Sequence, residues 1–169
     1  VKWFGLFATH AVIAVALAIT AVVCLLVMRN SPSFTPNTDP VLPKLMAAAK
    51  LGVTWEMCFL YAVVFGGFVA FSNYLPTYIK TVYGFSPVDA GARTAGFALA
   101  AVIARPIGGA LSDRIPPKYV VLVSLAGTAL TAFIAVFQPP PDVWSAATFI
   151  ALALFLGMGT GGVFAWVAR

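Results

Sequence analysis

Five long apolar stretches dominate this chain of 169 residues. A helix needs about 20 apolar residues, each rising about 1.5 Å, to cross about 30 Å of hydrocarbon. The stretches that reach this length are residues 6–28, 53–74, 92–112, 119–137 and 144–167. The sequence therefore predicts an all-α membrane protein with five transmembrane helices.

The composition agrees with a membrane protein and excludes several other classes. Hydrophobic residues make up 62% of the chain and charged residues only 9%, whereas a soluble domain carries about 25% charged residues. With one His and two Cys, the chain cannot build a multi-His metal site, a disulfide framework or a zinc finger. It also lacks the nucleophile–base pair or metal-ligand cluster that would indicate an enzyme. We therefore expect no enzymatic activity, no cofactor or metal, and no nucleic-acid partner.

The connections between the apolar stretches contain nearly all the prolines. In the longest connection, residues 29–52, four prolines block a regular helix over the first half. These are Pro32, Pro36, Pro40 and Pro43. Residues 42–51 are expected to form a short surface helix, with Lys44 and Lys50 directed toward lipid headgroups. The other connections are residues 75–91, which include Pro76, Gly84 and Pro87, residues 113–118, which form a tight basic turn, and residues 138–143.

The distribution of Lys and Arg predicts the orientation of the helices. With residue 1 outside, the cytoplasmic ends and loops hold Arg29, Lys44, Lys50, Arg114, Lys118 and Arg169, and the outer ends hold Lys2, Lys80 and Arg93. Cytoplasmic loops carry an excess of these residues, so the connection 29–52 is expected on the cytoplasmic side. The chain begins with Val and enters an apolar stretch at once. We therefore expect it to be an interior piece of a longer protein.

One arginine lies inside an apolar stretch, where a charged side chain is unexpected. Arg105 stands in the segment ALAAVIARPIGG (residues 98–109), eight residues before Asp113, which places it about 12 Å from the cytoplasmic edge of the bilayer. An arginine there costs about 2.5–3.5 kcal/mol on insertion scales and usually faces a water-filled cavity or a partner. Either Arg105 snorkels or pairs with a carboxylate elsewhere, or its planar, permanently charged guanidinium binds an anion. We favour the anion.

Aromatic residues and glycines lie at a similar depth. Tyr61 is about 12 Å beyond Val53, and Phe65 is one turn further on the same helix face. The two rings would wall a cavity around a small ion, with the Tyr61 hydroxyl as a donor, or pack against lipid. The last apolar stretch contains a cluster of glycines, Gly157, Gly159, Gly161 and Gly162. Such residues let helix backbones approach closely, either for packing alone or for movement between helices.

The segment GALSDRIPPK (residues 109–118) is similar to the signature loop of the major facilitator superfamily, Gly-x-x-x-Asp-Arg-x-Gly-Arg-Lys. Gly109, Asp113, Arg114 and Lys118 match, whereas prolines at 116 and 117 replace the Gly and Arg of the pattern. In that superfamily the loop joins the second and third helices of a six-helix half on the cytoplasmic side. The resemblance implies a twelve-helix fold, in which the charged residues of this loop make contacts that favour one conformational state.

Three further segments resemble the nitrate/nitrite porter branch of that superfamily. They are LYAVVFGGFVAFS (residues 60–72), ARPIGG (residues 104–109) and GMGTGGVF (residues 157–164). By this resemblance Arg105 binds the anion, and Tyr61 and Phe65 line its pocket. The resemblance also implies three parts of the chain. Residues 1–28 would be the last helix of the N-terminal half, residues 29–52 the cytoplasmic central linker, and residues 53–169 the first four helices of the C-terminal half.

The resemblance implies transport of nitrate or nitrite by alternating access, in a multi-pass protein of the cell membrane. The expected partners are the small anion, the lipid bilayer and the N-terminal half missing from this chain. Two alternatives stay open. One is a facilitator for an organic anion. The other is a non-catalytic membrane subunit of an enzyme complex, a class that usually shows His pairs or Cys clusters. The preference between nitrate and nitrite, the direction of flux, and the choice between anion exchange and proton coupling also stay open.

Overall fold

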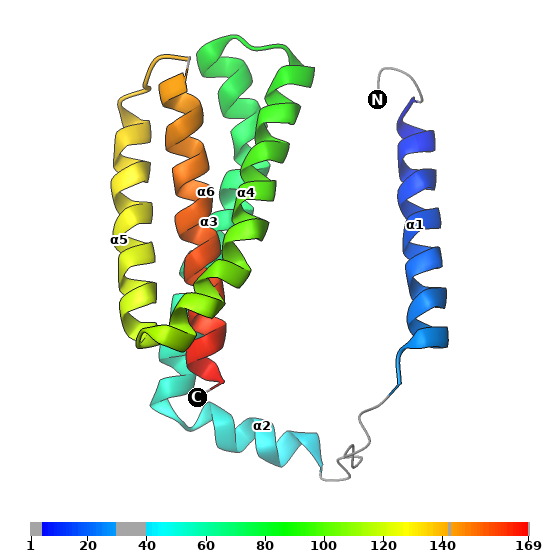
Figure 1. Cartoon of the computed structure of the whole chain (residues 1–169), viewed down its shortest axis with the longest axis vertical. Coiled ribbons are helices and arrows are strands. Elements are labelled where there is room, and N and C mark those ends of the chain that lie inside the picture. Colours follow the sequence, from blue (N-terminus) through cyan, green and yellow to red (C-terminus); the bar gives the residue numbers. More distant parts are fainter. Residues whose placement is uncertain (1–4, 30–39, 142, 169) are drawn as a thin grey trace. The chain divides into compact units, whose positions relative to one another are not determined.

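Every regular element of the described chain is a helix (Figure 1). The structure, a computed structural model, describes residues 5–29, 40–141 and 143–168. Its elements are α1 (Gly5–Val27), α2 (Val41–Ala49), α3 (Gly52–Tyr83), α4 (Pro87–Arg114), α5 (Pro117–Val136) and α6 (Val143–Val167). All except α2 are long and apolar enough to cross a membrane, which confirms the predicted all-α fold with five spans. Four residues used in the sequence predictions, Lys2, Pro32, Pro36 and Arg169, lie outside the described residues.

The chain divides into two compact units, Val1–Val41 and Leu42–Arg169. The first unit contains α1, whose apolar segment Phe7–Val27 leaves its side chains almost entirely exposed. A continuous apolar surface of this kind is suited to lipid rather than to water. The second unit contains the other spanning helices, and it carries every candidate site residue named above.

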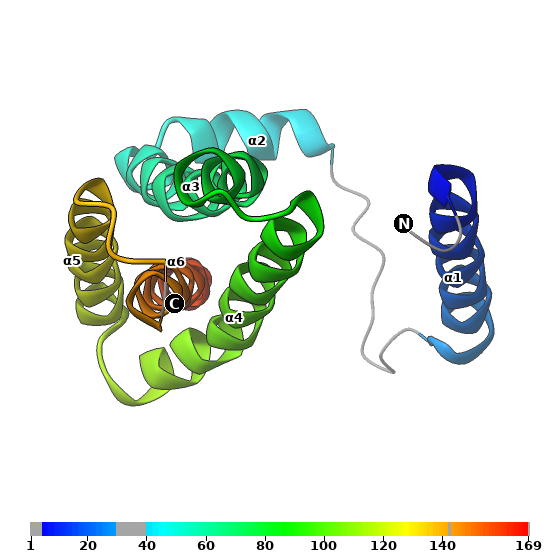
Figure 2. The same ribbon diagram turned by 90° about the horizontal axis from the view of Figure 1, so that it is seen from above.

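Within the second unit, α3 to α6 lie side by side and alternate in direction along the bundle (Figure 1). Seen from above, α6 lies between the other three helices and packs against each of them (Figure 2). Because successive helices alternate in direction, α4 and α6 run parallel, and they form the most extensive helix contact of the unit.

Helix α4 buries mainly small residues and exposes large apolar ones. The buried stripe of α4 recurs every three or four residues and comprises Ala90, Thr94, Phe97, Ala101, Ala104, Gly108 and Ser112. On the opposite face of the same helix, Leu99 is 61% exposed and Ile103 is 54% exposed. Helices in a bilayer associate through close packing of small residues. A large apolar side chain gains no hydrophobic free energy by moving from lipid into a contact between helices, because the lipid is equally apolar. The packing is therefore that of a membrane protein.

Glycines bring the backbones of α4 and α6 into direct contact. A Cβ atom added at Gly108 would collide with the backbone of Met158, and one added at Gly157 would collide with the carbonyl oxygen of Ala101. A Cβ atom at Gly161 would likewise collide with the carbonyl oxygen of Arg105. The backbone position of Arg105 is therefore fixed by its contact with α6.

The third helix is longer than the sequence predicted. The expected span ended at residue 74, but α3 continues through Pro76 to Tyr83. Proline removes one backbone donor, and neighbouring helices allow membrane helices to tolerate it. Here Leu75 and Ile79 are buried in the apolar core of the bundle, which holds the extra turns in helical form.

The predicted connection 75–91 was therefore wrong, because only residues 84–86 separate α3 from α4. Gly84 ends α3 in the left-handed conformation, with φ of 70°, which glycine adopts without strain. Ser86 caps the start of α4 by accepting a hydrogen bond from the amide of Asp89 at 3.2 Å. Pro87 then occupies the first helical position, where its missing amide removes no hydrogen bond.

The expected short helix after residue 41 is present as α2, and it ends at Ala49. No side chain of α2 is buried. Two residues at the start of α3 bind its last carbonyl groups, which have no partner within a helix. Thr54 donates to Ala48 at 2.7 Å, and the indole of Trp55 donates to Ala49 at 2.9 Å. These bonds attach the end of α2 to α3.

Exchanging Gly108 and Gly109 separately for alanine tests the α4–α6 contact. We expect Gly108→Ala to destabilise the protein by about 1–3 kcal/mol, because the new methyl group overpacks the contact. Gly109→Ala is the matched control, since a Cβ there meets nothing within 4 Å. The control should hold or raise stability, because alanine favours helices. Thermal unfolding in detergent of the complete gene product measures both, and equal melting temperatures would contradict the contact.

A second variant tests the attachment of α2. Replacing Thr54 by Val and Trp55 by Phe removes both donors, each worth about 0.5–1.5 kcal/mol. A helix of nine residues is not stable alone in water, so its amides should exchange with deuterium about tenfold faster or more. Thr81→Val is the control, because Thr81 bonds only within its own helix, to the carbonyl of Thr77 at 2.8 Å. Unchanged exchange over α2 in the double variant would show that the two bonds do not hold it.

Candidate functional site

Arg105 lies on α4, nine residues before the end of that helix at Arg114, or about 13 Å along its axis. Its side chain is partly buried and points at aromatic rings of α3. The guanidinium carbon lies 5.0 Å from the ring centre of Phe68 and 5.6 Å from that of Phe65. Both distances are typical of cation–π contacts.

The charge of Arg105 is not neutralised within the described part of the chain. Its Nε atom is buried and has no hydrogen-bond partner there. No carboxylate of the described residues forms an ion pair with it. Buried donors are nearly always satisfied in folded proteins, so an unpaired one calls for an explanation. The guanidinium of Arg105 therefore keeps a buried donor that no described residue satisfies, and such a group has the chemistry to bind an anion.

The two aromatic residues predicted to line the site occur in one row on α3. Tyr61 and Phe65 stack with ring centres 5.2 Å apart and an angle of 10° between the ring planes. Phe65 in turn lies 6.3 Å from Phe68. The structure thus brings Phe65 directly to Arg105, whereas Tyr61 reaches the guanidinium only through Phe65. Tyr61 also makes an edge-to-face contact with Phe164 of α6, with ring centres 5.2 Å apart.

A large cavity extends from Tyr61 toward one end of the bundle, between the start of α3 and the end of α6. It encloses about 760 Å³. Its walls include Glu56, Cys58, Tyr61, Phe164 and Trp166. Glu56 therefore faces this cavity rather than pairing with Arg105. Tyr61 is therefore the member of the aromatic row that borders this cavity.

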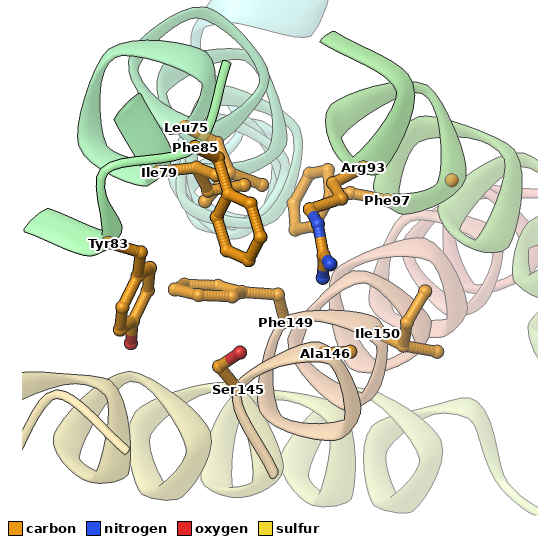
Figure 3. Close-up of a pocket in the computed structure, with 11 residues that line it drawn as sticks. Leu75, Ile79, Tyr83, Phe85, Arg93, Phe97, Ser145, Ala146, Phe149 and Ile150 are labelled. Carbon is orange, nitrogen blue, oxygen red and sulfur yellow. The ribbon is translucent and has the colours of Figure 1, made fainter. Parts of the chain in front are cut away.

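A second cavity, of about 210 Å³, lies at the opposite end of the bundle (Figure 3). Arg93 points into it beside Phe149 and Ile150, and its guanidinium carbon lies 4.1 Å from the ring centre of Phe85. Phe97 forms part of the wall and also stacks on Phe68. This ring therefore separates the second cavity from the surroundings of Arg105.

The residues of the expected cytoplasmic loop gather at the turn between α4 and α5. Asp113 and Arg114 are exposed in the last turn of α4, and Lys118 is exposed at the start of α5. The Lys118 ammonium group lies 4.9 Å from the ring centre of Tyr119. Gly109 lies one turn before Asp113 on α4, and a Cβ atom there would meet open space. The turn itself is only Ile115 and Pro116, shorter than predicted.

The four clustered glycines of α6 face three different helices. Gly157 and Gly161 contact α4, as described above. A Cβ atom at Gly159 would lie 2.9 Å from Val64 of α3 and 3.1 Å from Ser124 of α5. One at Gly162 would lie 3.2 Å from Val121 of α5. The cluster therefore allows close packing of α6 against all its neighbours at the depth of Arg105.

Sequence reasoning missed two aromatic residues of this site. Phe68 follows Phe65 by three residues and lies nearer to the guanidinium than Phe65 does. Its spacing from Tyr61 and Phe65 places all three on one helix face, and this signal was available in the sequence. Phe164 meets Tyr61 across two helices, and no local pattern indicates that contact.

The described residues hold no group of three or more His, Cys, Asp and Glu side chains able to bind a metal. Both cysteines, Cys24 and Cys58, are free thiols. The chemistry available at the site is therefore that of a fixed cation, aromatic faces and the Tyr61 hydroxyl. These groups can bind and release a small anion.

Curated relatives match either the whole chain or a part of it. The chain is 76% identical over 169 residues to the "Probable nitrate/nitrite transporter NarK2" of Mycobacterium tuberculosis. This match covers 100% of this chain and 43% of that relative. It is 35% identical over 124 residues to the "Nitrite extrusion protein" of Bacillus subtilis, covering 73% of this chain and 31% of the relative. It is 45% identical over 60 residues to the "Probable nitrate/nitrite antiporter NarK1" of Thermus thermophilus, covering 36% of this chain and 14% of the relative.

The chain thus spans less than half the length of these relatives. No solved structure matched it. The sequence model of the Major Facilitator Superfamily matches residues 1–169. With five apolar helices long enough to cross a bilayer, the chain is part of a multi-pass membrane protein. It belongs to the major facilitator superfamily.

Proposed function

We propose that the complete gene product transports nitrate or nitrite across the cell membrane by alternating access, without chemical conversion of the anion. The observation that carries this proposal is the guanidinium of Arg105, which forms no ion pair with a described residue and lies on aromatic rings inside a membrane-spanning helix. Nitrate and nitrite are also the anions in the name of the relative with 76% identity, and nitrite is the anion in the name of the relative with 35% identity. Both lines of support point to the same small, planar oxyanion.

Arg105 is the proposed binding group for the anion. Guanidinium is planar and permanently charged, and its N–H groups form a fork that matches two oxygen atoms of a planar oxyanion. In a low-dielectric site such charge-assisted bonds are stronger than in water. Arginine suits this task better than lysine, whose ammonium group is a strongly hydrated point charge.

Tyr61 and Phe65 complete the proposed pocket on the α3 side. Phe65 contacts both the Tyr61 ring and the guanidinium, so its ring would form a wall of the pocket on the α3 side. The Tyr61 hydroxyl lies on a ring that lines the large cavity, and it adds a hydrogen bond to an anion that enters by this route. Aromatic walls exclude water without supplying a competing charge.

We also propose how the chain fits into the complete transporter. Residues 1–28 form the last helix of the N-terminal half, residues 29–52 form the cytoplasmic linker, and residues 53–169 form the first four helices of the C-terminal half. Transporters of this class bind their substrate between two halves that rock around the site. Asp113, Arg114 and Lys118 then contact the cytoplasmic end of the bundle and favour one of the two states.

Replacing Arg105 tests the proposed function directly. We expect Arg105→Gln to abolish nitrate uptake by proteoliposomes that contain the complete gene product. Arg105→Lys should reduce uptake at low nitrate concentration at least tenfold, because lysine keeps the charge and loses the fork. Arg93→Gln is a matched control, since Arg93 also lies on a phenylalanine ring of the same bundle but lines the other cavity. It should stay within twofold of the unmodified protein.

Normal uptake by Arg105→Gln, with the protein folded and inserted, would overturn the proposal. Competition by unlabelled anions in the same assay identifies the substrate. Nitrate and nitrite should compete with each other, whereas an organic monocarboxylate at the same concentration should not. Efficient competition by the carboxylate would instead favour a transporter of organic anions.

The hydroxyl of Tyr61 can be tested apart from its ring. Tyr61→Phe keeps the stack on Phe65 and removes one hydrogen-bond donor, so the half-saturating nitrate concentration should rise at least about tenfold, as expected for the loss of a hydrogen bond to a charged group, worth about 1.5–3 kcal/mol. The maximal rate should stay within twofold. Tyr74→Phe, at an exposed position on the same helix, is the control and should change neither quantity. An unchanged half-saturating concentration for Tyr61→Phe would remove the hydroxyl from the site.

A further inference from the structure

We propose that Phe68, supported by Phe97, is a positioning residue for Arg105. Its ring holds the guanidinium in place in the membrane without neutralising the charge. This inference rests on the proposed function, because it assigns a task within the same anion site. It adds a residue that neither the loop motif nor the predicted pocket contained.

The contacts around Phe68 link two helices at the site. The Arg105 guanidinium carbon lies 5.0 Å from the ring centre of Phe68, closer than the 5.6 Å to Phe65. The Phe68 ring also stacks on Phe97, with ring centres 6.1 Å apart and planes 6° apart. Phe97 and Arg105 both belong to α4, eight residues apart, whereas Phe68 belongs to α3. The ring of Phe68 therefore meets α4 at two points along that helix.

Phe97 makes Phe68 a rigid support. Phe97 is only 1% exposed and belongs to the apolar core of the bundle, together with Leu75, Ala101 and Leu156. A side chain packed in such a core has little freedom to change rotamer. Because Phe68 stacks on this fixed ring, its own position is defined before any anion arrives.

An aromatic ring is well suited to hold a substrate-binding arginine. A carboxylate would hold the guanidinium more strongly, but it would cancel the charge and occupy the donors needed by the anion. A ring attracts the cation through its quadrupole and carries no net charge. The buried Nε atom without a hydrogen-bond partner among the described residues shows that polar groups do not fix the side chain on that edge. The guanidinium is thus held in place while its charge remains available.

Phe71 provides a matched control on the same helix. It also contacts Phe97, with ring centres 6.4 Å apart and planes tilted by 40°, so its removal disturbs the same aromatic cluster. Among the described residues, its ring makes no cation–π contact with Arg105, unlike those of Phe65 and Phe68. A general packing role of the cluster predicts similar effects at both positions. A positioning role predicts an effect at Phe68 only.

The experiment compares variants of the complete gene product in proteoliposomes, with nitrate as the probe. Phe68→Leu should raise the half-saturating nitrate concentration about tenfold, equal to about 1.4 kcal/mol, and keep the maximal rate within twofold. Phe71→Leu should leave both quantities within twofold. Phe68→Trp keeps a strong π face and should restore most of the lost affinity. Equal effects of the two leucine variants would overturn the proposal.

Fluorinated phenylalanine at position 68 separates the π face from the shape of the ring. Each added fluorine withdraws electron density and weakens cation–π attraction, while the ring keeps nearly the same size. The half-saturating concentration should rise stepwise from one to three fluorines, and the same series at position 71 should be flat. This series keeps the test valid if Phe68→Leu does not fold. A flat series at position 68 would overturn the proposal.

A failure of the positioning role of Phe68 can be distinguished from a failure of the proposed function. If Arg105→Gln transports nitrate normally, the function itself is wrong and the variants of Phe68 have no bearing on it. If Arg105→Gln is inactive and the fluorinated series at position 68 is flat, the anion site stands and only the positioning role is overturned.

Discussion

A single positive charge inside the hydrocarbon layer sets the requirements that the rest of this bundle meets. Arg105 costs several kcal/mol to place in lipid when it has no partner, and the described residues supply no carboxylate. They supply the faces of Phe65 and Phe68 instead. These rings lower the energy of the cation without cancelling its charge. The local structure therefore tolerates the charge and keeps it available.

The backbone of Arg105 is held in place as well as its side chain. Its carbonyl oxygen lies against Gly161 of α6, and Gly157 and Gly108 continue this contact along both helices. Small residues permit this approach, and packing at such short distance does not adapt gradually to displacement. A movement of α6 that kept this contact would therefore carry Arg105 with it. The glycines connect the packing of the bundle to the position of the charge.

Length and hydropathy were sufficient to predict the five spans, because a bilayer imposes a minimum length on every crossing helix. The end of α3 was not predictable in this way. From the local sequence, Pro76 predicts that the helix ends near this residue. In the structure, the burial of Leu75 and Ile79 in the core outweighs the loss of one backbone hydrogen bond. Gly84 and Pro87, which the sequence placed within a loop, form the end of one helix and the start of the next.

The candidate site was predictable where a residue stands out against its surroundings. Arg105 is such a residue, because a charge in an apolar stretch requires an explanation from sequence alone. Phe68 does not stand out, since this chain contains fourteen phenylalanines and most of them suit lipid as well as a pocket. Its role depends on which helix faces α3 and on which residue of that helix meets the ring. The sequence spacing indicated that Phe68 shares a helix face with Tyr61 and Phe65, but its contact with the guanidinium is tertiary information that only the structure provides.

The way in which the charge is held also bears on how a transporter of this kind can work. Among the described residues, the empty site carries the one positive charge of Arg105, and a monovalent anion bound there would offset that charge. Removing a charged group from water is far more costly than removing a neutral pair with satisfied hydrogen bonds. For the proposed function, an anion bound to Arg105 therefore makes closure over this part of the site easier than closure over the empty guanidinium. A carboxylate in place of Phe68 would neutralise the empty site as well and remove this difference.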